Sequence, residues 1–359
     1  MNYMPQSTSS NGLPEFLQGK FKMISYFSRS IVHGEPPYYF PEYSDDYLGY
    51  WDELNFLLGE EFDDHPLLEF VDVSGYGNWG EFHHWMNLTT RGGPESNFHA
   101  APPERLEEVI DRIIKGHLKA YPKTPAALNI HASEYNTGMK AFEQGLCWAR
   151  RDSFQPAFRT MEASIACGLK PGNAMVWEQM MPGRSFPADA DLPTDKSYLL
   201  PQRYFDVQAH YVGIGFNPWV NIWAHENCKR SLEFIEQYIG YRIRPALVWH
   251  RRVSEKEDIV LGLRNDGCSP PPGIITINAR FPDGTDHPVV LPAGEPEPGR
   301  LQMYTIPLQK RIDSFGPDTK IELSMKIQMR GKTMPVQWAV RKDTQQQDNF
   351  NLAVPLRRA

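Results

Sequence analysis

The chain has 359 residues, of which 41% are hydrophobic and 23% are charged, and its formal net charge is −7. These proportions are ordinary for a folded protein in water, and the negative charge excludes a general electrostatic attraction to nucleic acid or to an anionic membrane. No apolar stretch reaches the ~18–20 residues of a transmembrane helix, while aromatic residues, at 12%, are somewhat abundant, as in many carbohydrate-handling proteins.

The N-terminal segment, residues 1–20, is polar and rich in turn-forming residues. It carries neither the basic nor the apolar part of a secretory signal peptide. We therefore expect either a cytoplasmic protein or a protein whose true N-terminus lies upstream of Met1. In the second case a secreted or periplasmic location stays open.

Strand-like and helix-like segments alternate between residues 21 and 240. The clearest helix follows Ser44, a favourable N-cap residue, and carries apolar residues at three- and four-residue spacings until Asp63. Further helices are expected at 103–120, 137–144, 161–168, 202–210 and 229–239. Strands are expected at 24–32, 68–74, 126–131, 145–150, 174–178 and 211–216.

This alternation of short strands with helices is typical of a parallel α/β fold. A (β/α)8 TIM-type barrel needs eight strands, and six are visible, so the sequence predicts a barrel that lacks its first two βα units. An open, doubly wound sheet is the alternative, although no glycine-rich dinucleotide motif follows any of the strands.

From Tyr241 onward the pattern changes to polar and apolar residues that alternate with period two, separated by turn signals. Several such segments without a helical pattern predict an antiparallel β-sandwich. We expect a catalytic-type barrel domain over 1–240 and an accessory sandwich domain over 241–359. The sandwich is expected to buttress the barrel, with carbohydrate binding through Trp249 or Tyr304 as the alternative.

Two glutamates follow strands at positions where a barrel would present its functional groups, which is at the carboxyl ends of the strands. The strand at 68–74 runs into a glycine-rich turn that carries Glu81 among aromatic residues. The strand at 174–178 ends in Trp177 and Glu178. If two strands are missing upstream, these are barrel strands four and seven.

This arrangement resembles the four-over-seven barrel glycosidases, clan A of the glycoside hydrolases. More closely, the chain resembles a poorly characterised bacterial family of glycosidase-like barrels with a C-terminal β-sandwich. The resemblance is carried by Tyr43-Ser-Asp-Asp-Tyr, Phe62-Asp-Asp-His-Pro, Val71-Asp-Val-Ser-Gly-Tyr-Gly-Asn-Trp-Gly-Glu and Arg151-Asp-Ser. It implies that Glu81 is the acid/base and Glu178 the nucleophile of a glycoside hydrolase.

The chemistry of glycoside hydrolysis needs these residue types. A retaining glycosidase uses two carboxyl groups ~5–5.5 Å apart, one neutral and one ionised, whereas an inverting enzyme spaces them ~6.5–9.5 Å apart. Packing of Trp79 or Trp85 on Glu81 would favour its neutral, proton-donating form, and Arg151 would keep Glu178 ionised if it reached that side chain. We expect a retaining enzyme.

Polar and aromatic residues near the same strand ends are candidates for contacts with a sugar. The expected substrate-binding residues are Asn78, Trp79, His83, His131, Arg151, Asp152, Trp177 and Trp219. A buried core position is an equal alternative for His131. Asp72 is either a member of the site or a structural acceptor for Arg151 or a backbone amide.

Two other classes of function remain as alternatives. The chain could be a non-catalytic carbohydrate-binding or scaffold protein with a degenerate or incomplete barrel. A metal-dependent hydrolase would use His83, His131 and Asp152, but we expect neither a metal nor another cofactor. The expected partner is an oligosaccharide or polysaccharide, with no nucleic acid and no membrane, and a homo-oligomer stays open.

Overall fold

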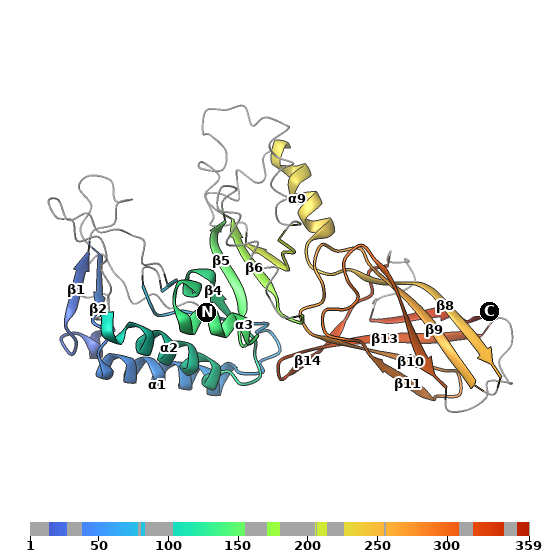
Figure 1. The fold of residues 1–359 in the computed structure, drawn as a ribbon, viewed down its shortest axis with the longest axis horizontal. Helices are drawn as coiled ribbons and strands as arrows, with labels where there is room; N and C mark the ends of the chain where they lie inside the picture. Colours follow the sequence, from blue (N-terminus) through green and yellow to red (C-terminus); the bar gives the residue numbers. More distant parts are fainter. Residues whose placement is uncertain are drawn as a thin grey trace. The chain divides into compact units, whose positions relative to one another are not determined.

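The computed structural model describes residues 14–26, 38–77, 80–82, 103–154, 171–179, 205, 207–213, 226–254, 256–308, 319–340 and 350–358. By its internal contacts the chain forms two compact units, Met1–Asp152 and Ser153–Ala359. Figure 1 shows the helices and strands coloured along the chain. Within the described ranges, no helix combines the length and apolar character needed to cross a membrane.

The first unit begins with the short 3-10 helix η1 (Glu15–Leu17) and an antiparallel hairpin. Strand β1 (Met23–Tyr26) pairs with β2 (Tyr38–Pro41), so that Met23 lies opposite Pro41. The described part of the strand expected at 24–32, residues 24–26, therefore belongs to the first arm of a hairpin. The prediction that it belongs to a parallel barrel is wrong, because apolar alternation identifies a strand without identifying its neighbour.

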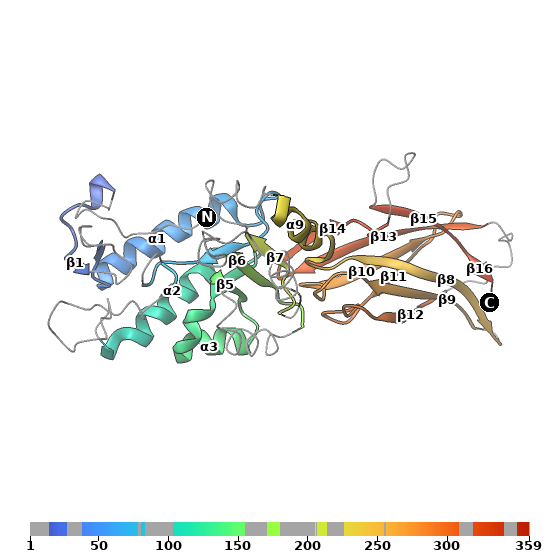
Figure 2. The same ribbon diagram turned by 90° about the horizontal axis from the view of Figure 1, so that it is seen from above.

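Two long helices run side by side in both views of the first unit (Figures 1 and 2). Helix α1 (Asp45–Phe62) begins as predicted, with the Ser44 hydroxyl accepting a hydrogen bond from the backbone N–H of Tyr47 at 3.3 Å. Helix α2 (Leu106–Ala120) follows the 3-10 turn η2 (Pro103–Arg105). Gly59 permits their close approach, because a Cβ atom there would collide with the carbonyl group of Ala120.

Three parallel strands follow among the described residues. They are β3 (Val71–Val73), β4 (Ala126–Asn129) and β5 (Trp148–Phe154), paired in that order. The 3-10 helix η3 (Ile130–Glu134) and helix α3 (Asn136–Glu143) connect β4 to β5. Val71 and Val73 are buried, and Val71 lines a cavity together with residues of α1 and α2. Successive side chains alternate between faces, so Asp72 occupies the opposite face of this sheet.

The described residues of the second unit include a parallel strand pair, helix α9 (Glu226–Tyr238) and two further sheets. Strand β6 (Met175–Gln179) pairs in parallel with β7 (Tyr211–Gly213), and helix α9 follows. One sheet has the order β12-β9-β8-β16, and the other has the order β11-β10-β13-β14 with β15 also paired to β13. The strands are β8 (Ile243–Val253), β9 (Lys256–Asn265), β10 (Ile274–Arg280), β11 (Asp286–Val290), β12 (Leu301–Pro307), β13 (Lys320–Met329), β14 (Lys332–Val336), β15 (Asn351–Pro355) and β16 (Arg357–Arg358).

These two sheets are antiparallel except for the parallel pair of β16 with β8. The alternation predicted from the sequence appears in the burial of β13, where Ile321, Leu323 and Met325 are buried and the residues between them are more accessible. The packing of the sheets as a sandwich stays a prediction, as does the domain boundary at residue 240.

The predicted fold class is wrong. The described residues hold four α-helices (α1, α2, α3 and α9), parallel strands β3 to β7 and antiparallel sheets, which is not a complete eight-helix TIM barrel. The sequence pattern located the short parallel strands, but it could not specify how many strands the sheet contains or whether the sheet closes into a barrel. The helix expected at 161–168 lies outside the described residues. Of the helix expected at 202–210, residues 202–204 and 206 lie outside them, residue 205 is helical, and 207–210 form a turn instead.

Candidate active site

The turn after β3 folds back on itself and places Glu81 beside Tyr76. The backbone N–H of Gly75 donates to the carbonyl of Gly80 at 3.2 Å, and that of Phe82 donates to Tyr76 at 2.9 Å. Gly75 has a φ of 119° and lies against the Trp51 ring, so no larger residue fits there. Phe82 is fully buried and anchors the far end of the turn.

Three tyrosines pack around this turn. The ring centroids of Tyr43 and Tyr76 are 5.1 Å apart, and those of Tyr76 and Tyr135 are 5.9 Å apart. Burial, followed by the electrostatic influence of neighbouring groups, raises the pKa of the Tyr76 hydroxyl far above its usual value. Burial likewise raises the pKa of Tyr135. Both phenols are therefore neutral over the physiological pH range and act through packing and hydrogen bonding.

Glu81 is held by Arg150, an arginine that the sequence pattern did not single out. The Nη2 atom of Arg150 donates to Oε1 of Glu81 at 2.8 Å, and its Nε atom lies 3.4 Å from Oδ2 of Asp72. The side chains of Arg150 and Glu81 are each 12% exposed, and that of Asp72 is 13% exposed. One guanidinium thus bridges two carboxylates in a mostly buried position.

Strand register explains how Arg150 reaches across the sheet. Asp72 on β3 lies beside Ala127 on β4, and Ala127 lies beside Trp148 on β5. Arg150 is two residues beyond Trp148 and shares its face. The guanidinium therefore has to pass over β4 to meet Asp72, across about 9–10 Å from strand to strand. On β4 the buried Asn129 lies beside Arg150, and the small, fully buried Ala127 lies beside Asp72, so the side chain crosses the face that these two residues share.

Arg151, the next residue along β5, lies on the opposite face and contacts His131. Its Nη1 atom is 2.7 Å from Nε2 of His131, whose Nδ1 atom is 3.7 Å from a carboxylate oxygen of Glu134. Because arginine can only donate, this Nε2 accepts, and the proton of the neutral ring is on Nδ1. His131 is 7% exposed. The guanidinium that bridges Asp72 is that of Arg150, not the Arg151 expected from the sequence.

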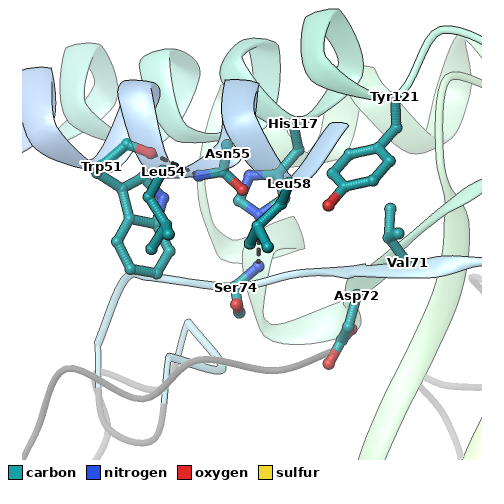
Figure 3. A pocket seen from close by; sticks show the side chains of 9 residues that line it. All are labelled: Trp51, Leu54, Asn55, Leu58, Val71, Asp72, Ser74, His117 and Tyr121. Carbon is teal, nitrogen blue, oxygen red and sulfur yellow. Dashed lines mark hydrogen bonds between the residues drawn. The ribbon is translucent and has the colours of Figure 1, made fainter. Parts of the chain in front are cut away.

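A small cavity lies on the helix side of β3 (Figure 3). It is lined by Trp51, Leu54, Asn55, Leu58, Val71, Asp72, Ser74, His117 and Tyr121. The carboxyl group of Asp72 itself points away from the helices in Figure 3. Its volume of about 20 Å³ suits one water molecule, so it is too small for a sugar. His117 connects α2 to the residue after β3. Its Nδ1 atom lies 2.9 Å from the carbonyl oxygen of Ile113, and its Nε2 atom accepts a hydrogen bond from the backbone N–H of Ser74 at 3.5 Å.

Of the predicted site residues, Glu81, His131 and Arg151 lie in the first unit. Asp152 belongs to β5 and is the last residue of that unit. Glu178 and Trp177 lie on β6 in the second unit, where Trp177 is fully buried. The roles of all these residues stay predictions. Asn78, Trp79, His83 and Trp219 lie outside the described residues.

The metal-dependent alternative gains no support from the described ranges, which contain no group of three or more His, Cys, Asp or Glu side chains suited to a metal ion. Of its three proposed ligands, His83 lies outside those ranges. The residues brought together around Glu81 are instead a carboxylate, a guanidinium and aromatic rings. This chemistry suits a charged or polar organic substrate.

No family model and no curated protein matches the chain. Solved structures match weakly: the DNA glycosylase AlkC of Pseudomonas fluorescens aligns at 10% identity, over 71% of this chain and 72% of that chain, with a TM-score of 0.17. OgpA of Akkermansia muciniphila aligns at 6% identity over 64% and 67%, also with a TM-score of 0.17.

Several of these weak neighbours are β-glucosidases. That of Thermotoga neapolitana, β-glucosidase 3B, aligns at 10% identity with a TM-score of 0.18, over 79% of this chain and 39% of that chain. Scores this low do not establish a shared fold.

Proposed function

We propose that the protein is a glycosidase-like protein that cleaves a glycosidic bond of an oligosaccharide or polysaccharide, with Glu81 and Glu178 as its carboxylates. The observation that carries the proposal is the position of Glu81. Its mostly buried carboxylate follows a parallel strand, is fixed by Arg150, and lies in a turn surrounded by tyrosines. Polar groups of this kind on a rigid support are typical of a preorganised site.

Glycoside hydrolysis by this route needs two carboxyl groups in different protonation states. Glu81 supplies one of them, and the ion pair accounts for its orientation. Glu178 is the second by prediction from the sequence, and it lies near the carboxyl end of β6. We propose the retaining mechanism, in which one carboxylate attacks the anomeric carbon and the other group exchanges a proton with the glycosidic oxygen.

A non-catalytic carbohydrate-binding protein is the second candidate. The ion pair itself favours it, because a carboxylate bonded to a guanidinium can serve as a fixed hydrogen-bond acceptor for sugar hydroxyls without taking part in a reaction. The tyrosines beside Glu81 fit either function. The two candidates differ in whether turnover accompanies binding.

Aryl glycosides of several sugars, in both anomeric forms, test the proposal. The wild-type protein should release the phenol, and Glu81→Gln and Glu178→Ala should each reduce kcat at least ~10²-fold, the usual size of a general-acid/base contribution. The exposed Glu53 of α1 provides a matched control, Glu53→Gln, with unchanged kcat.

Unchanged turnover in either active-site variant would contradict its assignment. Saturable binding of an oligosaccharide without product release, measured by calorimetry and lost in Glu81→Gln, would favour the non-catalytic alternative.

A further inference from the structure

We infer that Arg150 is the positioning residue of Glu81, and that its ion pair gives Glu81 the charged role of nucleophile instead of the proton-donating role implied by the sequence resemblance. The inference rests on the proposed function and deepens it. It concerns the bridge from Glu81 through Arg150 to Asp72, in which one guanidinium contacts both carboxylates.

The contact distances and burial support this role. Arg150 and Glu81 form an ion pair between a guanidinium and a carboxylate, whereas a general acid has to be neutral when it gives up its proton. The bond from Arg150 to Glu81 is 2.8 Å long, between side chains that are each 12% exposed. Little water screens such a pair, so its electrostatic influence is stronger than that of a surface pair.

Arg150 is itself held at both ends. Asp72 contacts its Nε atom, and Glu81 accepts from Nη2, so rotation of the guanidinium away from one carboxylate also disturbs the other. Its side chain crosses the face of β4 on which Ala127 and Asn129 lie. The backbone on the other side is fixed too, because Gly80 and Phe82 are hydrogen-bonded to the start of the turn. Glu81 is therefore oriented from both its backbone and its carboxylate.

In the resulting reaction, a carboxylate oxygen of Glu81 forms a bond to the anomeric carbon while the bond from that carbon to the leaving oxygen breaks. The leaving oxygen takes a proton from a neutral acid, for which Glu178 is the candidate. Water then attacks the anomeric carbon, its proton passes to the carboxylate of that acid, and the bond to Glu81 breaks. Both carboxyl groups return to their starting states.

Azide rescue of Glu81→Ala distinguishes the two roles, with a dinitrophenyl glycoside as the substrate because its leaving group needs no proton. A lost nucleophile predicts at least ~10³-fold lower kcat, from the missing covalent step. Azide should then restore turnover and yield a glycosyl azide of inverted configuration. Near-wild-type turnover of the dinitrophenyl substrate, or an azide product of retained configuration, would identify Glu81 as the acid/base and overturn the inference.

Variants of Arg150 test the positioning role. Arg150→Ala should lower kcat about 10²-fold through misplacement of Glu81, with KM changed less than about threefold and partial recovery on addition of guanidine. The kcat of Arg150→Lys should lie between those of the wild type and Arg150→Ala, because an ammonium group cannot contact two carboxylates in the same planar geometry. Loss of kcat that guanidine does not restore, in a variant that remains folded, would contradict a positioning role.

A double-mutant cycle tests the contact without any substrate. Glu81→Gln and Arg150→Gln should shift the melting temperature non-additively, by roughly 3 °C or more. The matched surface pair, Arg112 with Asp52 at 2.9 Å and side chains 33% and 38% exposed, should show a smaller coupling. Additive shifts at Glu81 and Arg150 would refute the inference even in an active enzyme. If the wild-type protein shows no turnover but the two substitutions remain thermally coupled, the nucleophilic role of Glu81 and the proposed function are both refuted. Arg150 would then still be the residue that orients Glu81.

Discussion

Tyr43 bridges two backbone groups of the turn that carries Glu81. Its hydroxyl donates to the carbonyl of Gly75 at 2.9 Å and accepts from the N–H of Gly77 at 3.1 Å, in a position that is 2% exposed. One buried hydroxyl thus satisfies a donor and an acceptor of a strained turn. The helix that begins just after Tyr43 is thereby connected to the candidate active site.

Tyr43→Phe should destabilise the protein by about 1–3 kcal/mol, because a buried carbonyl and a buried N–H lose their partner. We also expect weaker positioning of Glu81 and a lower kcat. Urea unfolding measures the first effect and aryl glycoside turnover the second. A matched control is Tyr50→Phe, because that hydroxyl accepts from the exposed amine of Lys20. Equal losses in both variants would contradict a special role for the Tyr43 bridge.

Gly75→Ala should be among the most damaging small substitutions in the first unit. The new Cβ would collide with the Trp51 ring, and the φ of 119° is unfavourable for alanine. Gly19 provides a control with a φ of 76° and open space where a Cβ atom would lie. Gly19→Ala should cost about 1–2 kcal/mol from backbone conformation alone. A melting temperature for Gly75→Ala no lower than that of Gly19→Ala would contradict the assigned contact with Trp51.

Ala127→Val should separate Arg150 from Asp72. Ala126→Val is the matched control, since both alanines are buried and neighbouring residues on β4 face opposite sides of the sheet. Both variants should lose roughly 1–3 kcal/mol through overpacking. Only Ala127→Val should also abolish the thermal coupling between Asp72→Asn and Arg150→Gln. Persistence of that coupling in Ala127→Val would show that the guanidinium does not depend on the space above Ala127.

Acid should destabilise both units between pH 6.5 and pH 4. Burial lowers the pKa of His117 from 6.5 to about 4, and burial lowers that of His210 equally. The histidines of the unfolded chain therefore bind protons more readily than those of the folded chain. Their contribution to the free energy of unfolding is complete above pH 6.5 and is lost as the pH falls from 6.5 to about 4. The expected loss is on the order of 3 kcal/mol for each histidine.

Urea unfolding at several pH values checks this prediction. His117→Gln should flatten the pH dependence of the first unit, and His210→Gln that of the second, while exposed His65→Gln provides the control. His210 links segments of its own unit, with Nδ1 accepting from the backbone of Met175 and Nε2 2.7 Å from the carbonyl of Pro270. A pH dependence that neither buried histidine alters would contradict the prediction.

Local features of the sequence predicted local structure well. Ser44 and Asp63 marked the limits of α1, and period-two alternation located β13. The order in which the strands pair was harder to predict from the sequence, because the apolar residues at 24–32 are compatible with any neighbouring strand that buries them. The hairpin partner at Tyr38–Pro41 lies within a proline-rich stretch that gives little strand signal.

Only part of the candidate site was predictable from the sequence, because local features were visible and strand pairing was not. Glycines and aromatic residues singled out the turn that carries Glu81, whereas Arg150 was indistinguishable from Arg151 until the register of β5 was known. A shift by one residue reverses the face of every side chain on a strand. The partner of Glu81 therefore depends on pairing between strands, which the spacing of charged residues does not encode.

The bridge over Ala127 has a consequence for recognising relatives of this chain. Four positions on separate segments, Asp72, Glu81, Ala127 and Arg150, have to change together or not at all if the contact is to survive. A bulky residue at position 127 should therefore accompany the loss of the charges at 72 and 150. Such joint variation can reveal common ancestry in sequences whose overall similarity has decayed, and it is readable from an alignment without any knowledge of the substrate.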